Sequence, residues 1–438
     1  MVLNCILTEL EKGPCRATDL AKILVNDENI TPENARQRVS RLKRPVTRVD
    51  ISLPNAEKIL CLEKHINTSL YKERISEILV NSNTAEGRVL RAIEIAGNVI
   101  PRCYLAKSSG TTFKPFGKKH ANIGNCVIKL LDLKLIGEKT DLQYITLISL
   151  PGWEKMTNEV RANYELESIY LNMIRAWLIK LGMSPKETLE IRNEKRCCEY
   201  GMFEWDLKGP CYLNGLVSKR TVSHPHGFLV GDISFGPIIN KKDLNGFLYK
   251  VDALNHQKGI YPFQPLYIAD AFDLEALMSL RKRGVIIATP SNVYSKEVAA
   301  SLKSLKNILK DAFGTFEETD KTLFEVLNKI LQVSGADFNL RSILFDFIAA
   351  RIFNYKGLRC TLRKKFILQN GDRFEFDVIA DKPGKKIYFE GKALASKNLL
   401  NIDEINNWYQ KKYPRLIQWL EFGVSAHSMT ETIHLKFA

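Results

Sequence analysis

Residues 371–392, near the C-terminal end, carry the pattern that most constrains the fold of this chain. From Phe374 to Val378 apolar and acidic side chains alternate in the order Phe-Glu-Phe-Asp-Val, at the two-residue period of a β-strand. The basic sequence Lys-Pro-Gly-Lys at 382–385 supplies turn residues, and a second apolar segment begins at Ile387. The stretch therefore predicts a β-hairpin.

The predicted hairpin gathers two carboxylates and an amine. Asp377 lies on the first strand, and Glu390 and Lys392, two residues apart, share one face of the second. Two carboxylates can hold a divalent metal ion, and an amine beside them can orient or deprotonate a water molecule. The combination indicates metal-assisted phosphodiester hydrolysis. The alternative is an ordinary surface hairpin with scattered charges.

The order of Asp377, Glu390 and Lys392 resembles the core of the PD-(D/E)xK nuclease superfamily, which includes many restriction endonucleases and Holliday-junction resolvases. The resemblance covers roughly residues 320–438. It departs from the family motif at Phe376, where the motif has a proline that many members also lack. The motif is short, so the rest of the domain has to be consistent with it.

The resemblance implies a role for each residue. Asp377 and Glu390 are expected to ligate Mg²⁺, for which Mn²⁺ substitutes, together with the backbone carbonyl of Gly391. Lys392 is expected to orient or activate the attacking water. Asp346, on an apolar predicted helix, matches the position from which a family helix often adds a carboxylate to the metal site. The alternative places Asp346 at the helix edge in water, because a buried carboxylate needs a partner.

The segments around the hairpin are those of an α/β/α sandwich. A predicted helix over 342–353 and a strand over 358–366 precede it. A helix over 402–413 and a strand over 416–422 follow it. This order is the one that the resemblance implies.

Composition narrows the class of protein. The 438 residues are 45% hydrophobic and 26% charged, as in globular proteins with sizeable cores. The net charge of +15 and the pI near 9.2 favour a polyanionic partner, most simply nucleic acid, although a merely basic soluble protein is the alternative. Nine scattered cysteines, no apolar run of membrane-spanning length and no recognisable signal peptide favour reduced thiols, a cytoplasmic location and no membrane partner.

Residues 1–68 have the order of a winged helix-turn-helix domain. Helices are expected over 3–12, 19–24 and 33–43, and strands over 46–53 and 58–62. In such a domain the third helix enters the major groove of DNA. The side chains on this helix that suit bases and phosphates are Arg36, Gln37, Arg38, Arg41 and Lys43. The alternative is a solvated basic face on a protein-interaction domain.

The same order recurs over residues 69–150. Helices are predicted over 84–97, 101–108 and 122–135, and a strand over 142–150. Lys118 and Lys119 lie at the entry of the third helix, where backbone N–H groups favour phosphate. The alternative is that these lysines are loop charges facing water.

The middle region, residues 151–310, has an element order similar to that of the nuclease core. Side by side with the C-terminal hairpin, Asp206 takes the place of Asp377, and Asp232 that of Glu390. Ser234 then stands where the lysine would be, and a serine cannot act as a cation. The region is either a degenerate nuclease fold or an unrelated α/β domain.

The sequence thus predicts an α/β and α+β multidomain protein: tandem winged helix-turn-helix domains followed by one or two restriction-endonuclease-like α/β/α domains, the last over 311–438. It resembles type IIS restriction enzymes, in which reading and cutting are on separate modules. We expect a Mg²⁺-dependent DNA endonuclease that acts on double-stranded DNA. Because one site cuts one strand, it is expected to form a homodimer at least transiently. The alternatives are an antiviral-defence, repair or transposon nuclease, or a non-catalytic DNA-binding regulator.

Overall fold

The structure is a computed structural model that describes residues 2–115, 121–140, 146–153, 155, 157–193, 196–213, 226–236, 238–312, 346, 349–350, 352–353, 356–368, 373–383, 385–390, 402–423 and 432–434. The chain divides into two compact units. The first comprises residues 1–139, 146–156 and 181–289, and the second comprises 140–145, 157–180 and 290–438. Among the described residues, no helix is both long and apolar enough to cross a bilayer.

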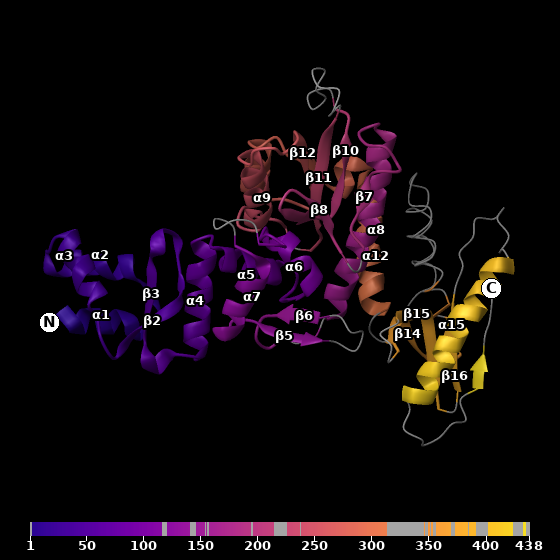
Figure 1. The fold of residues 1–438 in the computed structure, drawn as a ribbon, viewed down its shortest axis with the longest axis horizontal. Coiled ribbons are helices and arrows are strands. Elements are labelled where there is room, and N and C mark those ends of the chain that lie inside the picture. The colour runs from indigo at the N-terminus through magenta and orange to yellow at the C-terminus, as the bar shows by residue number, and fades with distance from the viewer. Residues whose placement is uncertain are drawn as a thin grey trace. The chain divides into compact units, whose positions relative to one another are not determined.

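The N-terminal part of the first unit is a helical layer against a small antiparallel sheet (Figure 1). Its elements are α1 (Val2–Glu11), β1 (Cys15–Arg16), α2 (Ala17–Glu28), α3 (Pro32–Ser40), β2 (Val46–Ser52) and β3 (Lys58–Leu62), with short 3₁₀ turns at Pro54–Ala56 and Glu63–His65. The sheet order is β1-β3-β2. Ile6, Leu24 and Val39 from the three helices meet Leu60 of β3 in one apolar core.

Helix α3 begins where the sequence predicts and ends earlier than expected. The hydroxyl of Thr31 accepts a hydrogen bond from the backbone N–H of Asn34, and Pro32 occupies the first helical position. The helix ends at Ser40 rather than at Lys43. The last part of the predicted basic helix therefore lies beyond it.

The following part repeats this arrangement after one additional helix, α4 (Ser69–Asn81). Its elements are α5 (Ala85–Ile95), β4 (Val99–Pro101), α6 (Arg102–Ser109), α7 (Ile123–Asp132), β5 (Gly137–Thr140) and β6 (Thr146–Ser149). The sheet order is β4-β6-β5, so in both sheets the third strand of the chain lies in the centre. Both parts thus have the same element order and the same strand order.

The rest of the first unit is built on a five-stranded mixed sheet (Figure 1). Its elements are β7 (Glu190–Ile191), β8 (Cys198–Tyr200), β9 (Phe203–Trp205), β10 (Leu207–Cys211), β11 (Gly227–Ser234), α9 (Asn245–Asn255), β12 (Phe263–Ala269), α10 (Leu274–Arg281) and β13 (Ile286–Ala288). The order is β13-β12-β11-β10-β7, while β8 and β9 form a separate hairpin. Strand β11 is antiparallel to β10 and parallel to β12.

The described part of the second unit contains helices from the middle of the chain and a C-terminal sheet. The helices are α8 (Asn158–Lys180), α11 (Pro290–Val293) and α12 (Lys296–Ala312). The sheet region comprises β14 (Arg359–Ile367), β15 (Arg373–Lys382), β16 (Lys385–Phe389), α15 (Ile402–Gly423) and β17 (Thr432–His434). The strand order is β14-β15-β16-β17, with β17 parallel to β16 and the other pairs antiparallel. The predicted hairpin is confirmed as β15 and β16.

One predicted strand is wrong. Residues 416–422 belong to α15, which continues through Pro414 to Gly423. A proline inside a helix removes one backbone hydrogen bond, but here the helix continues past Pro414. Leu416 is fully buried in a cluster with Phe376 and Tyr388 of the sheet. The strand that extends the sheet is β17 instead.

Candidate functional site

The β15–β16 register places the two predicted metal-binding carboxylates across from one another. Val378 pairs with Phe389, so the same register continued by one residue puts Asp377 opposite Glu390. Side chains in directly opposed positions of an antiparallel pair have Cβ atoms about 4.5–5.5 Å apart. Asp377 and Glu390 are half-buried, between apolar residues that are fully buried, such as Phe376. The hairpin therefore forms a rigid support for two neighbouring acids.

A lysine that the sequence did not single out contacts this pair. Lys412 of α15 donates a 2.5 Å hydrogen bond to Oε1 of Glu390 and a 2.9 Å hydrogen bond to the backbone carbonyl of Glu375. The Lys412 and Glu390 side chains are 27% and 14% exposed. The ammonium thus connects the second acid to the strand that carries Asp377.

The remaining predicted residues of this site are placed only in part. Asp346 lies in a helical segment and is buried, so the alternative that it sits at a helix edge in water is wrong. Ala350, in the same segment, packs against Val378 of the hairpin. Gly391 and Lys392 lie outside the described residues. In the part of the chain that the structure describes, no three histidine, cysteine or acidic side chains form a group that could hold a metal ion.

The middle sheet contains a similar pair of strands. Leu207 of β10 pairs with Gly231 of β11, and the backbone N–H of Asp206 donates to the carbonyl of Gly231 over 2.9 Å, so Asp206 lies at the end of the pair where β11 carries Asp232. The local sequences agree as well, since Phe-Glu-Trp-Asp ends at Asp206 and Phe-Glu-Phe-Asp ends at Asp377. In each case the hairpin is followed by a helix and a strand parallel to its second strand. The two hairpins are thus alike in their acids, in their local sequence and in the helix and strand that follow them.

The helix after each hairpin supplies a lysine with the same contacts. Lys250 of α9 lies 2.5 Å from Oδ2 of Asp232 and donates a 2.9 Å hydrogen bond to the backbone carbonyl of Glu204. Glu204 is two residues before the first acid, as Glu375 is in the C-terminal hairpin. Lys250 also lies over the ring of Trp205, at 3.9 Å. Its contacts are therefore those of Lys412, repeated in the first unit.

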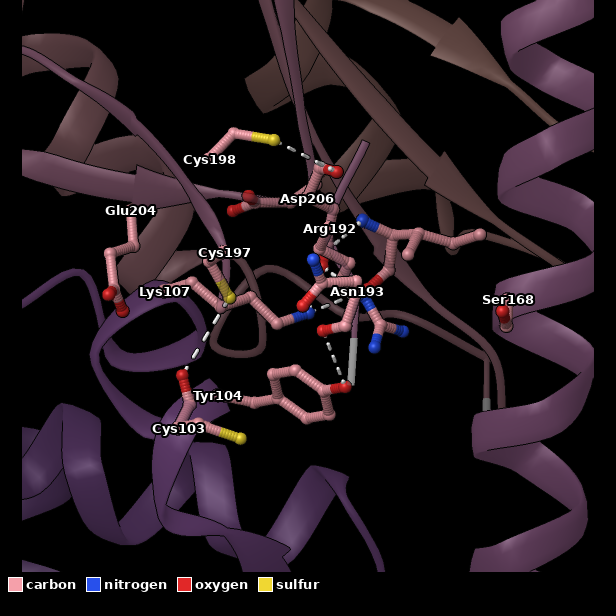
Figure 2. A network of polar contacts seen from close by, with 12 residues as sticks. Cys103, Tyr104, Lys107, Ser168, Arg192, Asn193, Cys197, Cys198, Glu204 and Asp206 are labelled. Atoms are coloured by element: carbon pink, nitrogen blue, oxygen red, sulfur yellow. Dashed lines mark hydrogen bonds and ion pairs between the residues drawn. The ribbon is translucent and has the colours of Figure 1, made fainter. Parts of the chain in front are cut away.

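The first acid of the middle hairpin is enclosed by two more cations (Figure 2). Lys107 of α6 donates to Oδ2 of Asp206 over 2.7 Å, and Nε of Arg192 lies 2.5 Å from Oδ1. The backbone N–H of Ile233 also donates to Oδ2. Burial opposes ionisation of Asp206, but Lys107 and Arg192 more than offset it and lower its pKa. Asp206 is therefore a buried carboxylate that two neighbouring cations keep ionised.

Burial also controls the titration of the groups around Lys250. It raises the pKa of Asp232 and lowers that of Lys250, and the contact between the two opposes both shifts. Burial raises the pKa of Glu204 to about 7, against the opposing attraction of Lys250. No part of this cluster presents an accessible carboxylate pair, because Asp206 and Asp232 are both buried.

The basic residues of the N-terminal part are mostly open to solvent. Arg36, Gln37, Arg41 and Lys43 are exposed, and among the described residues Arg36, Arg41 and Lys43 form no salt bridge. Arg38 differs because it donates to Glu28 of α2 over 2.8 Å. This face of α3 and the residues after it can therefore contact a polyanion. Lys118 and Lys119, predicted for the second helical part, lie outside the described residues.

In the second helical part, α6 is occupied by contacts with the middle sheet region. The hydroxyl of Tyr104 donates to the backbone carbonyl of Asn193, and the thiol of Cys197 to that of Cys103 (Figure 2). A Cβ built on Gly110 would lie 2.1 Å from the carbonyl oxygen of Gly246 in α9. The backbones of α6 and α9 thus approach as closely as only glycine permits.

Sequence reasoning missed the lysines and the arginine that neutralise the acids. Each of Lys412, Lys250, Lys107 and Arg192 lies outside the strand that carries the acid it contacts, at a separation in sequence that no local pattern relates to that acid. The one available signal was the repeated Phe-Glu-aromatic-Asp sequence, each copy followed by a helix with an inward-facing lysine.

Comparisons with known proteins add little to this geometry. No protein-family model matches the sequence, and no curated protein matches it. Among solved structures, a repair endonuclease from Pyrococcus abyssi matches with 14% sequence identity and a TM-score of 0.20. The match covers 33% of this chain and 52% of that one, about half of its length. A likeness with this TM-score supports no conclusion about the fold or the function.

Proposed function

We propose that the protein is a metal-dependent endonuclease that hydrolyses phosphodiester bonds of double-stranded DNA at the C-terminal hairpin. The observation that carries the proposal is the position of Asp377 opposite Glu390, on strands buried against helices. Two half-buried carboxylates held side by side repel each other, and a divalent cation bound by both would offset this repulsion further than Lys412 does by its contact with Glu390. A divalent cation bound by this pair of carboxylates would lie next to a phosphodiester bond placed there.

The donor set fits a hard divalent cation. Carboxylate oxygens are the ligands that Mg²⁺ prefers, and Mn²⁺ accepts the same ligands. Asp377 and Glu390 would hold the ion, with the carbonyl of Gly391 and the carboxylate of Asp346 as further candidates. When bound, the ion lowers the pKa of a water molecule and offsets charge on the phosphate. Lys392 would orient that water, and its ammonium group would place a proton close to the leaving oxygen.

We propose that DNA is held by the N-terminal part. The order helix, strand, helix, helix, strand, strand with the third strand in the centre of the sheet supports a winged helix-turn-helix interpretation. The exposed Arg36, Gln37 and Arg41 suit base edges and phosphates. The second helical part has the same order, but its α6 packs against the middle region. The first part is therefore the stronger candidate for reading sequence.

This layout, with reading and cutting on separate parts of the chain, resembles that of type IIS restriction enzymes, and we propose sequence-specific restriction as the role. An antiviral-defence, repair or transposon nuclease would use the same chemistry. Cleavage of both strands would require a homodimer, at least transiently, because the C-terminal site carries one pair of acids.

A non-catalytic DNA-binding regulator is the second candidate. The observation that favours it is the middle hairpin, in which the same acid pair is closed by Lys107, Arg192 and Lys250 and serves packing. If the acids of the C-terminal hairpin likewise serve packing and bind no metal ion, the chain would bind DNA without cutting it.

Plasmid cleavage with Mg²⁺ or Mn²⁺ tests the choice. We expect wild-type protein to nick or linearise DNA, and Asp377→Asn and Lys392→Ala to lose about 10³-fold or more in rate while they still bind DNA. Metal-dependent cutting that survives both substitutions contradicts the site. Binding without cutting, in wild-type protein and with either metal, favours the regulator.

A further inference from the structure

Each of the two hairpins is contacted by a lysine that lies outside its own strands. Lys250 and Lys412 each come from the helix that follows, and each contacts the second acid at 2.5 Å. Each also donates to the carbonyl of the glutamate two residues before the first acid, at 2.9 Å. Two regions of one chain, in separate compact units, thus form the same three-part contact.

The contact fixes the carboxylate of the second acid. An ammonium group has three donors, and Lys412 directs two of them to Glu390 and to the backbone of β15. A lysine whose ammonium group makes two such contacts loses most of its rotamer freedom, and the carboxylate that it contacts is fixed as well. Because the backbone contact is at Glu375, the orientation of Glu390 is tied to the strand that carries Asp377.

The helix lysine is distinct from the two cations that enclose Asp206 in the middle hairpin. Asp206 is enclosed by Lys107 and Arg192, which come from α6 and from the residue after β7, outside the repeated hairpin and helix. Lys250 is fully buried, whereas Lys412 remains 27% exposed. The acids of the middle hairpin are therefore enclosed by the additional cations, whereas the helix lysine is common to both hairpins.

We propose that Lys412 is a positioning residue of the C-terminal site, which holds the carboxylate of Glu390 in the orientation that binds a divalent metal ion. This inference rests on the proposed function, because it concerns the same acid pair. Groups that hydrogen-bond a metal-binding carboxylate typically account for about 10–100-fold in metal affinity or activity. Lys412 has that position, and Lys250 is its counterpart in the copy that has become structural.

The opposite sign is also physically possible, and this makes the proposal testable. A cation beside a carboxylate competes with a metal ion for it, so removal of a merely competing lysine tightens metal binding. Removal of a positioning lysine weakens it. The direction of the change in affinity separates the two.

The experiment measures Mn²⁺ binding to the full chain by electron paramagnetic resonance titration, alongside plasmid cleavage. The site-specific signal is the binding that Asp377→Asn removes. We expect Lys412→Met to weaken that binding by about 10–100-fold, and Lys412→Arg to restore part of it. Lys411→Met is the matched control, because Lys411 is the exposed neighbour on the same helix and should leave the affinity unchanged.

Cleavage kinetics give the second readout. For a positioning role, the Mn²⁺ concentration for half-maximal rate rises in Lys412→Met, and saturating Mn²⁺ recovers most of kcat. If Lys412→Met does not fold, Lys412→Gln, which keeps an N–H donor for one of the two contacts, takes its place. Unchanged or tighter Mn²⁺ binding in the folded variant overturns the proposal.

The two proposals fail in different ways. Wild-type protein that binds Mn²⁺ at the acid pair but cuts no nucleic acid removes the nuclease, while the effect of Lys412→Met on affinity still decides the positioning role. Cleavage that is insensitive to Lys412→Met at every metal concentration keeps the nuclease and removes the positioning role. Absence of any Mn²⁺ binding that depends on Asp377 overturns both.

Discussion

Lys107 and Asp206 form a 2.7 Å hydrogen-bonded ion pair in which the two side chains are 6% and 0% exposed. The lysine comes from α6 of the second helical part, and the aspartate precedes β10 of the middle sheet. Since both charges are buried, each is stabilised by polar protein groups in place of water, namely the other member of the pair and the backbone of Ile233, with Arg192 in addition for Asp206. This pair therefore joins the two parts of the first unit.

Loss of the lysine should be costly. We expect Lys107→Met to lower the free energy of unfolding by about 3–5 kcal/mol, because it leaves a buried carboxylate with Arg192 as its remaining cation. Lys114→Met is the control, because Lys114 is 73% exposed and lies 3.8 Å from Glu199, and it should cost less than about 1 kcal/mol. Urea denaturation measures both. Equal effects of the two substitutions on the free energy of unfolding would show that the buried pair stabilises the fold no more than the exposed one.

Stability should fall with pH across the titration of Glu204. Its pKa is raised from 4.5 to about 7 in the folded state, so between these values the folded protein binds more protons than the unfolded chain. Stability is then highest at the low end of this window and decreases toward pH 7. Glu204→Gln, which keeps the neutral form, should leave the melting temperature unchanged near pH 4.5 and raise it by a few degrees at pH 8. A difference between variant and wild type that is the same at both pH values would contradict the assignment.

Arginines of the N-terminal part should contribute unequally to DNA binding. We expect Arg36→Ala and Arg41→Ala to weaken binding, and each to reduce the slope of log K against log salt by about 1 if it contacts phosphate. Arg38→Ala should have a smaller effect, since Arg38 is paired with Glu28. Fluorescence anisotropy over several salt concentrations and DNA sequences measures this. Lys22→Ala, at an exposed position of α2, is the control.

The outcome for these arginines has three forms. A loss that is uniform across sequences indicates phosphate contact, and a loss confined to some sequences indicates base reading. No loss in Arg36→Ala or Arg41→Ala would reject this surface as the DNA contact.

Gly246→Ala should destabilise the first unit although it improves helix propensity. Alanine inside α9 is favoured over glycine by about 1 kcal/mol. Here, however, the added Cβ would lie 2.5 Å from the carbonyl oxygen of Ser108, so the backbones of α6 and α9 would have to separate. We expect a net loss of stability of about 1–3 kcal/mol by thermal denaturation. Gly259→Ala, where nothing lies within 4 Å, reports the cost of a positive φ alone. A gain in stability for Gly246→Ala would mean that the helices have room to move apart.

Much of the secondary structure followed from local patterns. The start of α3 could be predicted because Thr31 and Pro32 supply a cap and a first turn within three residues. The predicted end at Lys43 and the strand over 416–422 were wrong because both depended on packing. A helix end and the state of an apolar segment are decided by the core that the segment meets, as with Leu416 in its cluster.

The sequence by itself predicted the C-terminal hairpin, with Asp377 and Glu390 on paired strands, because a two-residue period and nearby turn residues specify a hairpin locally. It aligned Asp206 and Asp232 with these acids but left the middle region open between a degenerate nuclease fold and an unrelated α/β domain. Only the tertiary structure decided what surrounds these acids. Lys412, Lys107 and their counterparts reach the acids from helices far away in the chain, by long side chains whose direction no local pattern specifies. For the same reason, the comparison that put Ser234 in the place of Lys392 contained no signal for Lys250 of α9, which contacts Asp232.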